Sequence, residues 1–162
     1  MMSSATKKFE LVTEDTIKLD DGTALYRIRA LIAFGNVESG ELGGYIEKET
    51  NLDVYGDAWV SGNAWVYGDA RVSGNARVSG NAWVYGDAWE VSPLQIQGTR
   101  WFLNMASKTI LRIGCQEHEI SVWLKQYQQI GEEHGVTEAE VQEYLQYIEL
   151  AAKLYGMQGE AQ

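Results

Sequence analysis

The feature that most constrains this chain is a six-residue unit that repeats without interruption from Val54 to Trp89. Each unit reads Val, Tyr or Ser, Gly, Asp or Asn, Ala, Trp or Arg. Because every unit should adopt the same local structure, so short a period predicts a coil with one short strand and one corner per unit. The recurring apolar residues are Val54, Val60, Val66, Val72, Val78 and Val84, with Ala58, Ala64, Ala70, Ala76, Ala82 and Ala88.

The alternation inside the unit predicts which side chains face inward. Successive side chains of a strand point to opposite faces, so the alanine and the valine share one face and the larger residues share the other. The Gly-Asp or Gly-Asn step suits a sharp corner, since these residues tolerate positive φ. We therefore expect an interior of valine and alanine alone, with tryptophan, tyrosine and arginine outside.

This pattern resembles the hexapeptide-repeat family of left-handed parallel β-helices, in which three units complete one triangular coil. The resemblance implies that each residue lies over the residue 18 positions later, about one strand spacing away. Trp65 should then stack on Trp83, and Tyr67 on Tyr85. Such an aromatic face could be covered by the rest of the chain, could mediate self-association, or could bind a partner.

The same spacing predicts two mixed pairs on the outside of the coil. Trp59 should lie over Arg77, and Arg71 over Trp89 with Asp53 beyond it. Each Trp–Arg contact would be a cation–π pair.

The flanking segments indicate how the coil is closed. Lys48 and Glu90 stand at valine positions, so the regular part should be two coils, whose open ends need covering. A turn at Asp20-Asp21-Gly22 predicts a hairpin before the coil. We expect residues 1–8 to be disordered, 9–50 to form a β-hairpin and lead-in cap, 51–92 the hexapeptide β-helix, and 93–162 a strand pair followed by two amphipathic helices.

The two helices are predicted from apolar residues at helical spacing and from a capping box at Thr137 and Glu140. The predicted fold class is mainly β with α. It consists of a short left-handed parallel β-helix, an N-terminal β-hairpin cap, and C-terminal strands with a two-helix hairpin.

Candidate catalytic groups are few. Acyltransferases and zinc carbonic anhydrases of the hexapeptide-repeat type use histidines in the coil, whereas His118 and His134 both lie outside the repeat. Cys115 near His118 falls short of a metal site or an oriented nucleophile. The stacked corner acids Asp69 and Asp87 are too few for a calcium shell. We expect no catalytic residue, metal or cofactor.

The charge is strongly acidic, with 23 acids against 13 bases and a formal net charge of -10. This disfavours direct binding to nucleic acid or to an anionic membrane and favours a basic protein partner. The excess gathers in the last third, where the acids either form a solvated face or imitate a phosphate backbone. The candidate partner face comprises Glu132, Glu133, Glu138, Glu140 and Glu143.

The lead-in LYRIRALIAFGNVESGELGGYIEKETNL, followed by Gly-Asp-Ala and Gly-Asn-Ala units, resembles small phage and prophage proteins of unassigned function. Gly114-Cys115 and the acidic helices are similar to the tail of some of them. The single cysteine and the absence of an apolar leader indicate the cytoplasm of the host cell.

By analogy, the resemblance implies a non-enzymatic inhibitor of a host nucleic-acid-acting defence protein, of the anti-CRISPR kind. We expect it to be a homo-oligomer, a dimer rather than a larger assembly. The alternatives are a self-assembling structural phage component and a hexapeptide-type acyltransferase.

Overall fold

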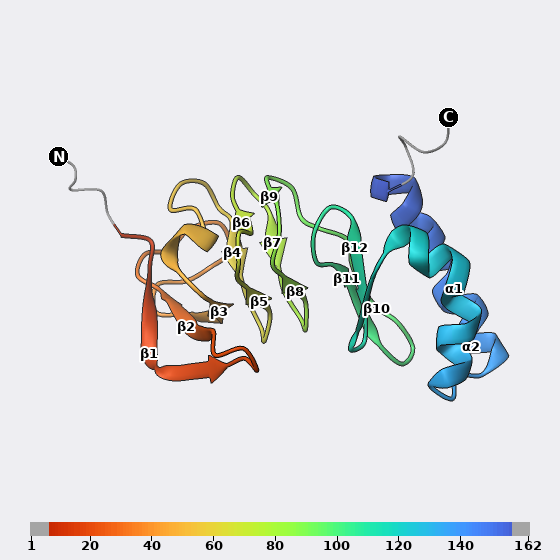
Figure 1. Cartoon of the computed structure of the whole chain (residues 1–162). Helices are drawn as coiled ribbons and strands as arrows, with labels where there is room; N and C mark the ends of the chain where they lie inside the picture. Colours follow the sequence, from red (N-terminus) through yellow and green to blue (C-terminus); the bar gives the residue numbers. More distant parts are fainter. Residues whose placement is uncertain (1–6, 157–162) are drawn as a thin grey trace. The chain divides into compact units, whose positions relative to one another are not determined.

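The computed structural model describes residues 7–156 and places them in two compact units that divide between Pro93 and Leu94. The first unit is built from a long hairpin followed by short strands, and the second from strands followed by two helices (Figure 1). The chain is thus mainly β, with both α-helices in its C-terminal part, as the sequence predicts.

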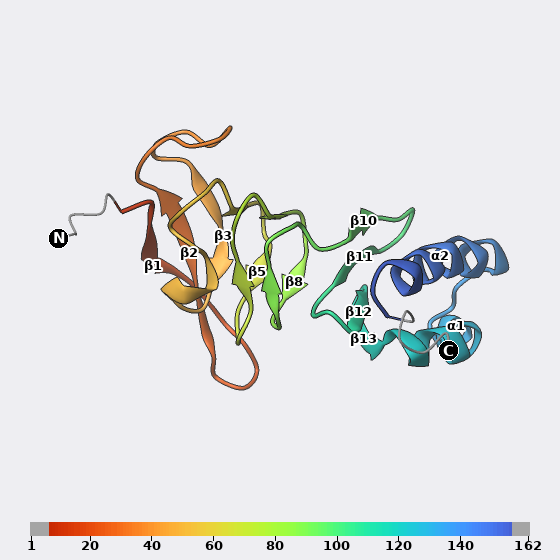
Figure 2. The same ribbon diagram turned by 90° about the horizontal axis from the view of Figure 1, so that it is seen from above.

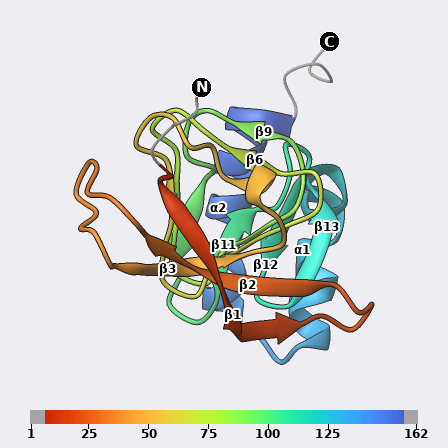
Figure 3. The ribbon, with the colours of Figure 1, turned by 90° about the vertical axis from the view of Figure 1, so that its left-hand side faces the viewer.

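The first unit begins with the predicted hairpin. Strand β1 (Phe9–Lys18) pairs antiparallel with β2 (Ala24–Ala30), and the two run side by side in Figure 3. Gly22 has a φ of 93° in the connecting turn, which a residue with a side chain rarely adopts. Strand β3 (Leu42–Ile46) then pairs antiparallel with β2. The hairpin is thereby joined to the repeat, because β3 also pairs in parallel with the repeat strand Trp65–Val66.

The repeat forms strands of two residues separated by corners. Its parallel pairs join β4 to β7, β5 to β8, and β6 to β9. The sheets of this unit are small and mixed: one sheet has five strands in the order β1-β2-β3-β5-β8, and each of the two others has two strands. Trp59 pairs with Arg77 and Trp65 with Trp83, so the spacing of 18 is confirmed there. The strands are β4 (Trp59–Val60), β5 (Trp65–Val66), β6 (Arg71–Val72), β7 (Arg77–Val78), β8 (Trp83–Val84) and β9 (Ala88–Trp89).

The interior of the repeat follows the predicted alternation over most of its length. Five of the valines, Val60 to Val84, are fully buried, and the alanines from Ala58 to Ala82 are exposed by 2% or less. The backbone pairing stacks the buried side chains in three columns. These columns are Ile46, Val66 and Val84; Val60 and Val78; and Leu52, Val72 and Trp89.

The prediction that Val54 is an interior residue is wrong. Its side chain is 42% exposed, and Leu52 occupies the column instead, bridged in parallel to Val72. The offset is 20 residues there, because the loop after Leu52 is longer than a repeat corner. Gly56 lies so close to Gly74 that a Cβ on Gly56 would approach the Gly74 carbonyl oxygen to 2.7 Å.

The prediction of valine and alanine alone inside the coil is also wrong at the other end. Arg71 pairs with Ala88 and Val72 with Trp89, an offset of 17, and Asp87 has a φ of 70° at the shortened corner. A slip of one residue exchanges the two faces of a strand. Trp89 is therefore fully buried and Ala88 exposed. The predicted stack of Arg71 on Trp89 is absent, although Arg71 does reach Asp53, at 3.7 Å.

The open end of the first coil is closed by a lysine that was expected to lie in a disordered segment. Lys8 is 1% exposed, and its ammonium group donates hydrogen bonds to the carbonyl oxygens of Asp53 (3.1 Å), Gly56 (3.3 Å) and Ala58 (2.7 Å). Burial lowers the pKa of the Lys8 amine. The prediction of disorder is thus wrong for Lys8, because these carbonyls lack partners in a further coil; residues 1–6 lie outside the described residues.

A buried asparagine completes this cap. Asn51 ends a short 3-10 turn, η1 (Glu49–Asn51), and its amide donates to the carbonyls of Gly68 (3.2 Å) and Ala70 (2.8 Å). Its side-chain oxygen accepts from the backbone N–H of Glu47, whose own carboxylate accepts from Gly68 N–H at 2.8 Å. Polar side chains therefore satisfy backbone groups that the next coil would otherwise pair.

The second unit contains a four-stranded antiparallel sheet where the sequence predicted a strand pair. The extra strands arise because Gly114, with a φ of 59°, reverses the chain, so that the polar run after it pairs before the first helix begins. The thin sheet buries Leu103, Met105 and Leu111. The strands are β10 (Gln95–Gln97), β11 (Phe102–Met105), β12 (Ile110–Ile113) and β13 (Gln116–Glu119).

Two helices follow the sheet, as predicted. Helix α1 (Ile120–Glu133) and helix α2 (Glu138–Ala151) lie side by side in Figure 2, and α2 continues into the π-helical turn η2 (Ala152–Gly156). Thr137 and Glu140 form the predicted capping box. In the described part of the chain, no helix combines the length and apolar character needed to cross a membrane.

Candidate functional site

The predicted aromatic face is present on the first unit. The Trp65 and Trp83 rings stack with centroids 4.3 Å apart and planes 5° from parallel. Beside them, the Tyr67 and Tyr85 rings lie 5.5 Å apart and are tilted by 48°. All four side chains are half-buried. Parallel strands in register therefore bring like residues together, and the four rings form a surface that is neither core nor fully exposed.

A cation and a carboxylate that sequence reasoning missed extend this face. Tyr45 pairs with Trp65 in the parallel ladder, and the Arg27 guanidinium lies 4.4 Å from the centre of the Tyr45 ring. Arg27 also donates to Asp15 at 2.7 Å and to the Tyr45 hydroxyl at 2.6 Å. The hydrogen bond from Arg27 holds the pKa of the Asp15 carboxyl below its ordinary value. The β1–β2 hairpin thus covers one end of the aromatic face.

Trp59 does not belong to the exposed aromatic surface. Its backbone pairs with Arg77 as predicted, but the side chain is 1% exposed because the Phe34 ring packs on it edge to face at 5.3 Å. Gly43 allows this close packing, since a Cβ there would lie 2.8 Å from the indole. The flank therefore covers one tryptophan of the repeat and leaves Trp65 and Trp83 half-buried.

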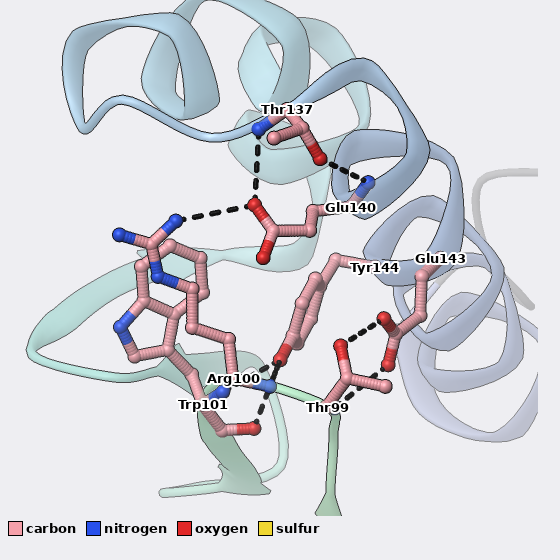
Figure 4. A network of polar contacts seen from close by, with 7 residues as sticks. All are labelled: Thr99, Arg100, Trp101, Thr137, Glu140, Glu143 and Tyr144. Atoms are coloured by element: carbon pink, nitrogen blue, oxygen red, sulfur yellow. Dashed lines mark hydrogen bonds and ion pairs between the residues drawn. The ribbon is translucent and has the colours of Figure 1, made fainter.

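Two of the five predicted acidic residues hold the second unit together. The Glu143 carboxylate accepts from the Thr99 backbone N–H at 2.9 Å, from the Thr99 hydroxyl, and from Tyr147 at 2.6 Å. Glu140 accepts from the Thr137 N–H at 3.0 Å and from Arg100 at 3.1 Å (Figure 4). These bonds tie α2 to the turn between β10 and β11.

Tyr144, one turn of α2 after Glu140, holds the same turn between β10 and β11 in place. Its hydroxyl accepts from the backbone N–H groups of Arg100 (2.9 Å) and Trp101 (2.6 Å). Gly98 leaves room for this contact, because a Cβ there would lie 2.4 Å from the hydroxyl oxygen. Next to it, the Glu143 carboxylate raises the pKa of Tyr147 to about 12, since it accepts the phenol's hydrogen bond.

The other three predicted acids lie exposed around the tip of the helical hairpin. Glu132 and Glu133 end α1, and Glu138 begins α2. The Gln128 amide lies 3.4 Å from a Glu132 oxygen and 3.1 Å from a Glu138 oxygen, so acids of both helices meet there. Hydrogen bonds from Gln142 and Gln128 lower the pKa of the Glu138 carboxyl.

The structure also forms a cavity that the sequence did not indicate. Its volume is about 70 Å³, and it lies between the sheet and the two helices of the second unit. The walls are largely apolar and aromatic, and Cys115 and His134 are the exposed residues at its edge. The lining residues are Trp101, Ile113, Cys115, Gln116, Trp123, Tyr127, Ile130, Gly131, His134, Val136, Glu140, Val141, Tyr144 and Ile148.

Cys115 and His118, considered above as a possible reactive pair, have separate environments. Cys115 is exposed in the β12–β13 turn, and its sulfur lies 3.9 Å from the Gln116 amide. His118 packs edge to face on Trp123 at 5.0 Å and lies 3.3 Å from the Gln116 side-chain oxygen. Within residues 7–156, no three of His, Cys, Asp and Glu gather as potential metal ligands.

The stacked parallel strands and the repeating corners define the class of this protein. It is a solenoid-like repeat protein, mainly β, with two helices after the repeat. Residues 70–86 match the model of a family described as the YdcK β-solenoid repeat. No curated protein matches the chain.

Proposed function

We propose that this protein is a non-enzymatic binding module of phage type. In the host cytoplasm it would occupy the basic, nucleic-acid-binding surface of a defence protein, in the manner of acidic anti-CRISPR proteins. In this proposal the repeat is a left-handed parallel β-helix that serves as a rigid support. The net charge of -10 supports the preference for a basic partner.

The observation that carries the proposal is the position of the exposed acids Glu132 and Glu133. They end α1, whose last turn contains no basic residue. The C-terminal end of a helix carries partial negative charge, so each acid there costs about 0.3 to 1 kcal/mol instead of stabilising the fold. Glu138 adds a third carboxylate at the same tip. Folding explains Glu138 at the start of α2 but not the two acids at the end of α1, whereas contact with a basic surface would account for all three.

The test compares two variants that lose the same charge. The hairpin variant carries Glu132→Gln, Glu133→Gln and Glu138→Gln. The control carries Glu14→Gln, Asp20→Asn and Glu38→Gln, three exposed acids of the first unit. Calorimetry with a deca-arginine peptide, repeated at rising salt, measures the affinity, and single-stranded DNA serves as the competitor for the peptide.

We expect the hairpin variant to lose about tenfold or more in affinity, with a shallower salt dependence, and the control to lose much less. The stability of the hairpin variant should change little, because the unfavourable charges at the end of α1 are removed together with the favourable charge of Glu138 at the start of α2. Equal losses in the two variants would refute a localised partner face. Binding that ignores salt would refute electrostatic mimicry.

A second candidate function, assembly of identical copies, is favoured by the half-buried ring pairs of the aromatic face. The repeat itself offers a mild substitution, because serine replaces tyrosine at the same position in other units, as at Ser61. Tyr67→Ser with Tyr85→Ser should shift sedimentation toward the monomer. Tyr55→Ser is the matched control, since Tyr55 occupies the same repeat position and is 73% exposed. An unchanged, defined species in all three proteins would exclude assembly through this face.

A further inference from the structure

The cavity of the second unit has the composition of a site for a small organic cation. Four aromatic side chains contribute to its wall: Trp101, Trp123, Tyr127 and Tyr144. The Trp101 and Tyr144 rings lie 5.6 Å apart and are tilted by 55°, so they meet at an angle and form a corner instead of a closed stack. Aromatic rings attract cations through their electron-rich faces, and cages of such rings recognise methylated ammonium groups.

One carboxylate oxygen is available on the same cavity. The two hydrogen bonds that the Glu140 carboxylate accepts, from the Thr137 N–H and from Arg100, both go to Oε1. Its second oxygen, Oε2, accepts no hydrogen bond from any residue in the range 7–156, and in Figure 4 it points to the side where Trp101 and Tyr144 lie. Glu140 lines the cavity and is only partly exposed. The hydrogen bond from the Thr137 backbone lowers the pKa of the Glu140 carboxyl, which is therefore ionised at neutral pH.

We propose that this cavity binds a methylated ammonium group, with the aromatic rings against its methyl groups and Glu140 Oε2 beside its positive charge. A charge partly removed from water interacts more strongly with a nearby carboxylate than it does at an open surface. The inference does not depend on the function proposed above, because it concerns a different surface and a different ligand.

The size of the cavity limits what can enter. About 10 to 15 Å³ of such cavity volume holds one water molecule, so a cavity of about 70 Å³ has room for roughly five groups of that size. Only a head group of a few heavy atoms therefore fits, and a longer chain must extend past the exposed edge at Cys115 and His134. Two sources carry this chemistry: a free quaternary amine of the choline type, and the side chain of a trimethylated lysine in a peptide.

Arg100 weakens the attraction between Glu140 and a ligand cation without removing it. Its guanidinium lies 3.1 Å from Glu140 Oε1 and over the Trp101 ring, 4.6 Å from the ring centre, so it already uses one carboxylate oxygen and one face of the indole. A ligand cation must share the carboxylate with this residue. We therefore expect millimolar affinity for a free head group, in which the aromatic walls contribute much of the binding.

The experiment titrates the whole protein with choline and, separately, with the neutral alcohol in which a tert-butyl group replaces the trimethylammonium group. The two ligands have nearly the same shape and differ in charge. Binding is followed by the indole N–H signals of Trp101 and Trp123, with the buried Trp59 and Trp89 of the first unit as internal controls. Peptides containing lysine or trimethyl-lysine distinguish the two sources of the cation.

We expect choline to bind about tenfold more tightly than the neutral isostere. Glu140→Gln should reduce this preference to about twofold or less, while glutamine keeps the capping box. Glu149→Gln, an exposed acid of the same helix outside the cavity, should leave it unchanged. Tyr127→Leu keeps the wall apolar and should weaken choline binding severalfold.

Helical circular dichroism checks that each variant is folded. If Glu140→Gln does not fold, Tyr127→Leu and the comparison of choline with its neutral isostere in the unaltered protein still test whether the cavity binds a cation. Equal affinity for cation and isostere would overturn the proposal in favour of a merely apolar cavity. Absence of binding by both ligands, or a loss in Glu149→Gln as large as that in Glu140→Gln, would overturn it as well.

Discussion

Replacing Trp89 with alanine measures whether the last strand of the repeat has slipped by one residue. The repeat pattern gives Trp89 the same outward position as Trp65, whereas the structure buries Trp89 fully in the column of Leu52 and Val72. Trp65 is only half-buried, with one ring face against Trp83. The two substitutions should therefore differ in cost, although the sequence positions are equivalent.

The magnitudes follow from burial. Removing a fully buried indole costs about 3 to 5 kcal/mol, because both the transfer free energy and the packing around the cavity are lost. The Gly86 carbonyl also loses its 2.9 Å hydrogen bond from the indole N–H. For Trp65→Ala, the lost ring pair and a part of the buried area amount to about 1 to 2 kcal/mol. We expect Trp89→Ala to be the more destabilising by about 1 to 4 kcal/mol.

Amide hydrogen exchange in the first unit provides the assay, since it reports the unfolding free energy of that unit separately. Suitable probes are the N–H groups of Ser61 and Tyr67, which donate to the carbonyls of Val78 and Val84. Equal destabilisation by the two substitutions would refute the slipped register. It would indicate that the spacing of 18 continues to the end of the repeat.

Three further predictions concern polar groups. Tyr144→Phe should destabilise the second unit by about 2 to 4 kcal/mol, measured by urea unfolding at the helical circular dichroism signal, because two backbone N–H groups lose their acceptor. The pKa of Asp15 is lowered, so its bond to Arg27 stabilises the fold above the ordinary carboxyl pKa of about 3.9, and this contribution is lost as the pH falls through the lower pKa of the folded state. Asp15→Asn should therefore flatten the acid side of a plot of stability against pH. Tyr147 should titrate near 12 by ultraviolet absorbance, and Glu143→Gln should lower this pKa. The hydrogen bond from Tyr147 to Glu143 therefore stabilises the fold fully below the ordinary tyrosine pKa of about 10 and loses this effect as the pH rises through about 12.

The period of six carried most of the information about the repeat. Alternation and the glycine corners suffice to predict that Trp65 faces Trp83 and that the valines between Val60 and Val84 are buried, because these features depend on residues close in sequence. The slip at Asp87 could not be read from the same pattern. Burying an indole removes far more apolar area from water than burying a methyl group, so Trp89 takes the interior place from Ala88.

The polar contacts were less predictable because their partners are distant in sequence. Lys8 looks like part of a charged tail, yet the carbonyls that it satisfies lie 45 to 50 residues later. Glu140 and Glu143 look like members of an acidic surface, yet Arg100 and Thr99 hold them from 40 and 44 residues away. Composition gives the sign of a charge, and only the folded chain shows whether that charge has a partner.

The aromatic surface that the repeat can offer to another molecule is narrower than its sequence suggests. Four of its six units end in tryptophan, which suggests a broad aromatic wall. The Phe34 ring covers Trp59, and the slipped register carries Trp89 inside, so Trp65 and Trp83 are the half-buried pair of the four. The flank and the register, more than the repeat itself, therefore select which rings can meet a partner. A substitution that restored the spacing of 18 at the last corner would place Trp89 outside and widen that surface, at the expense of the interior column.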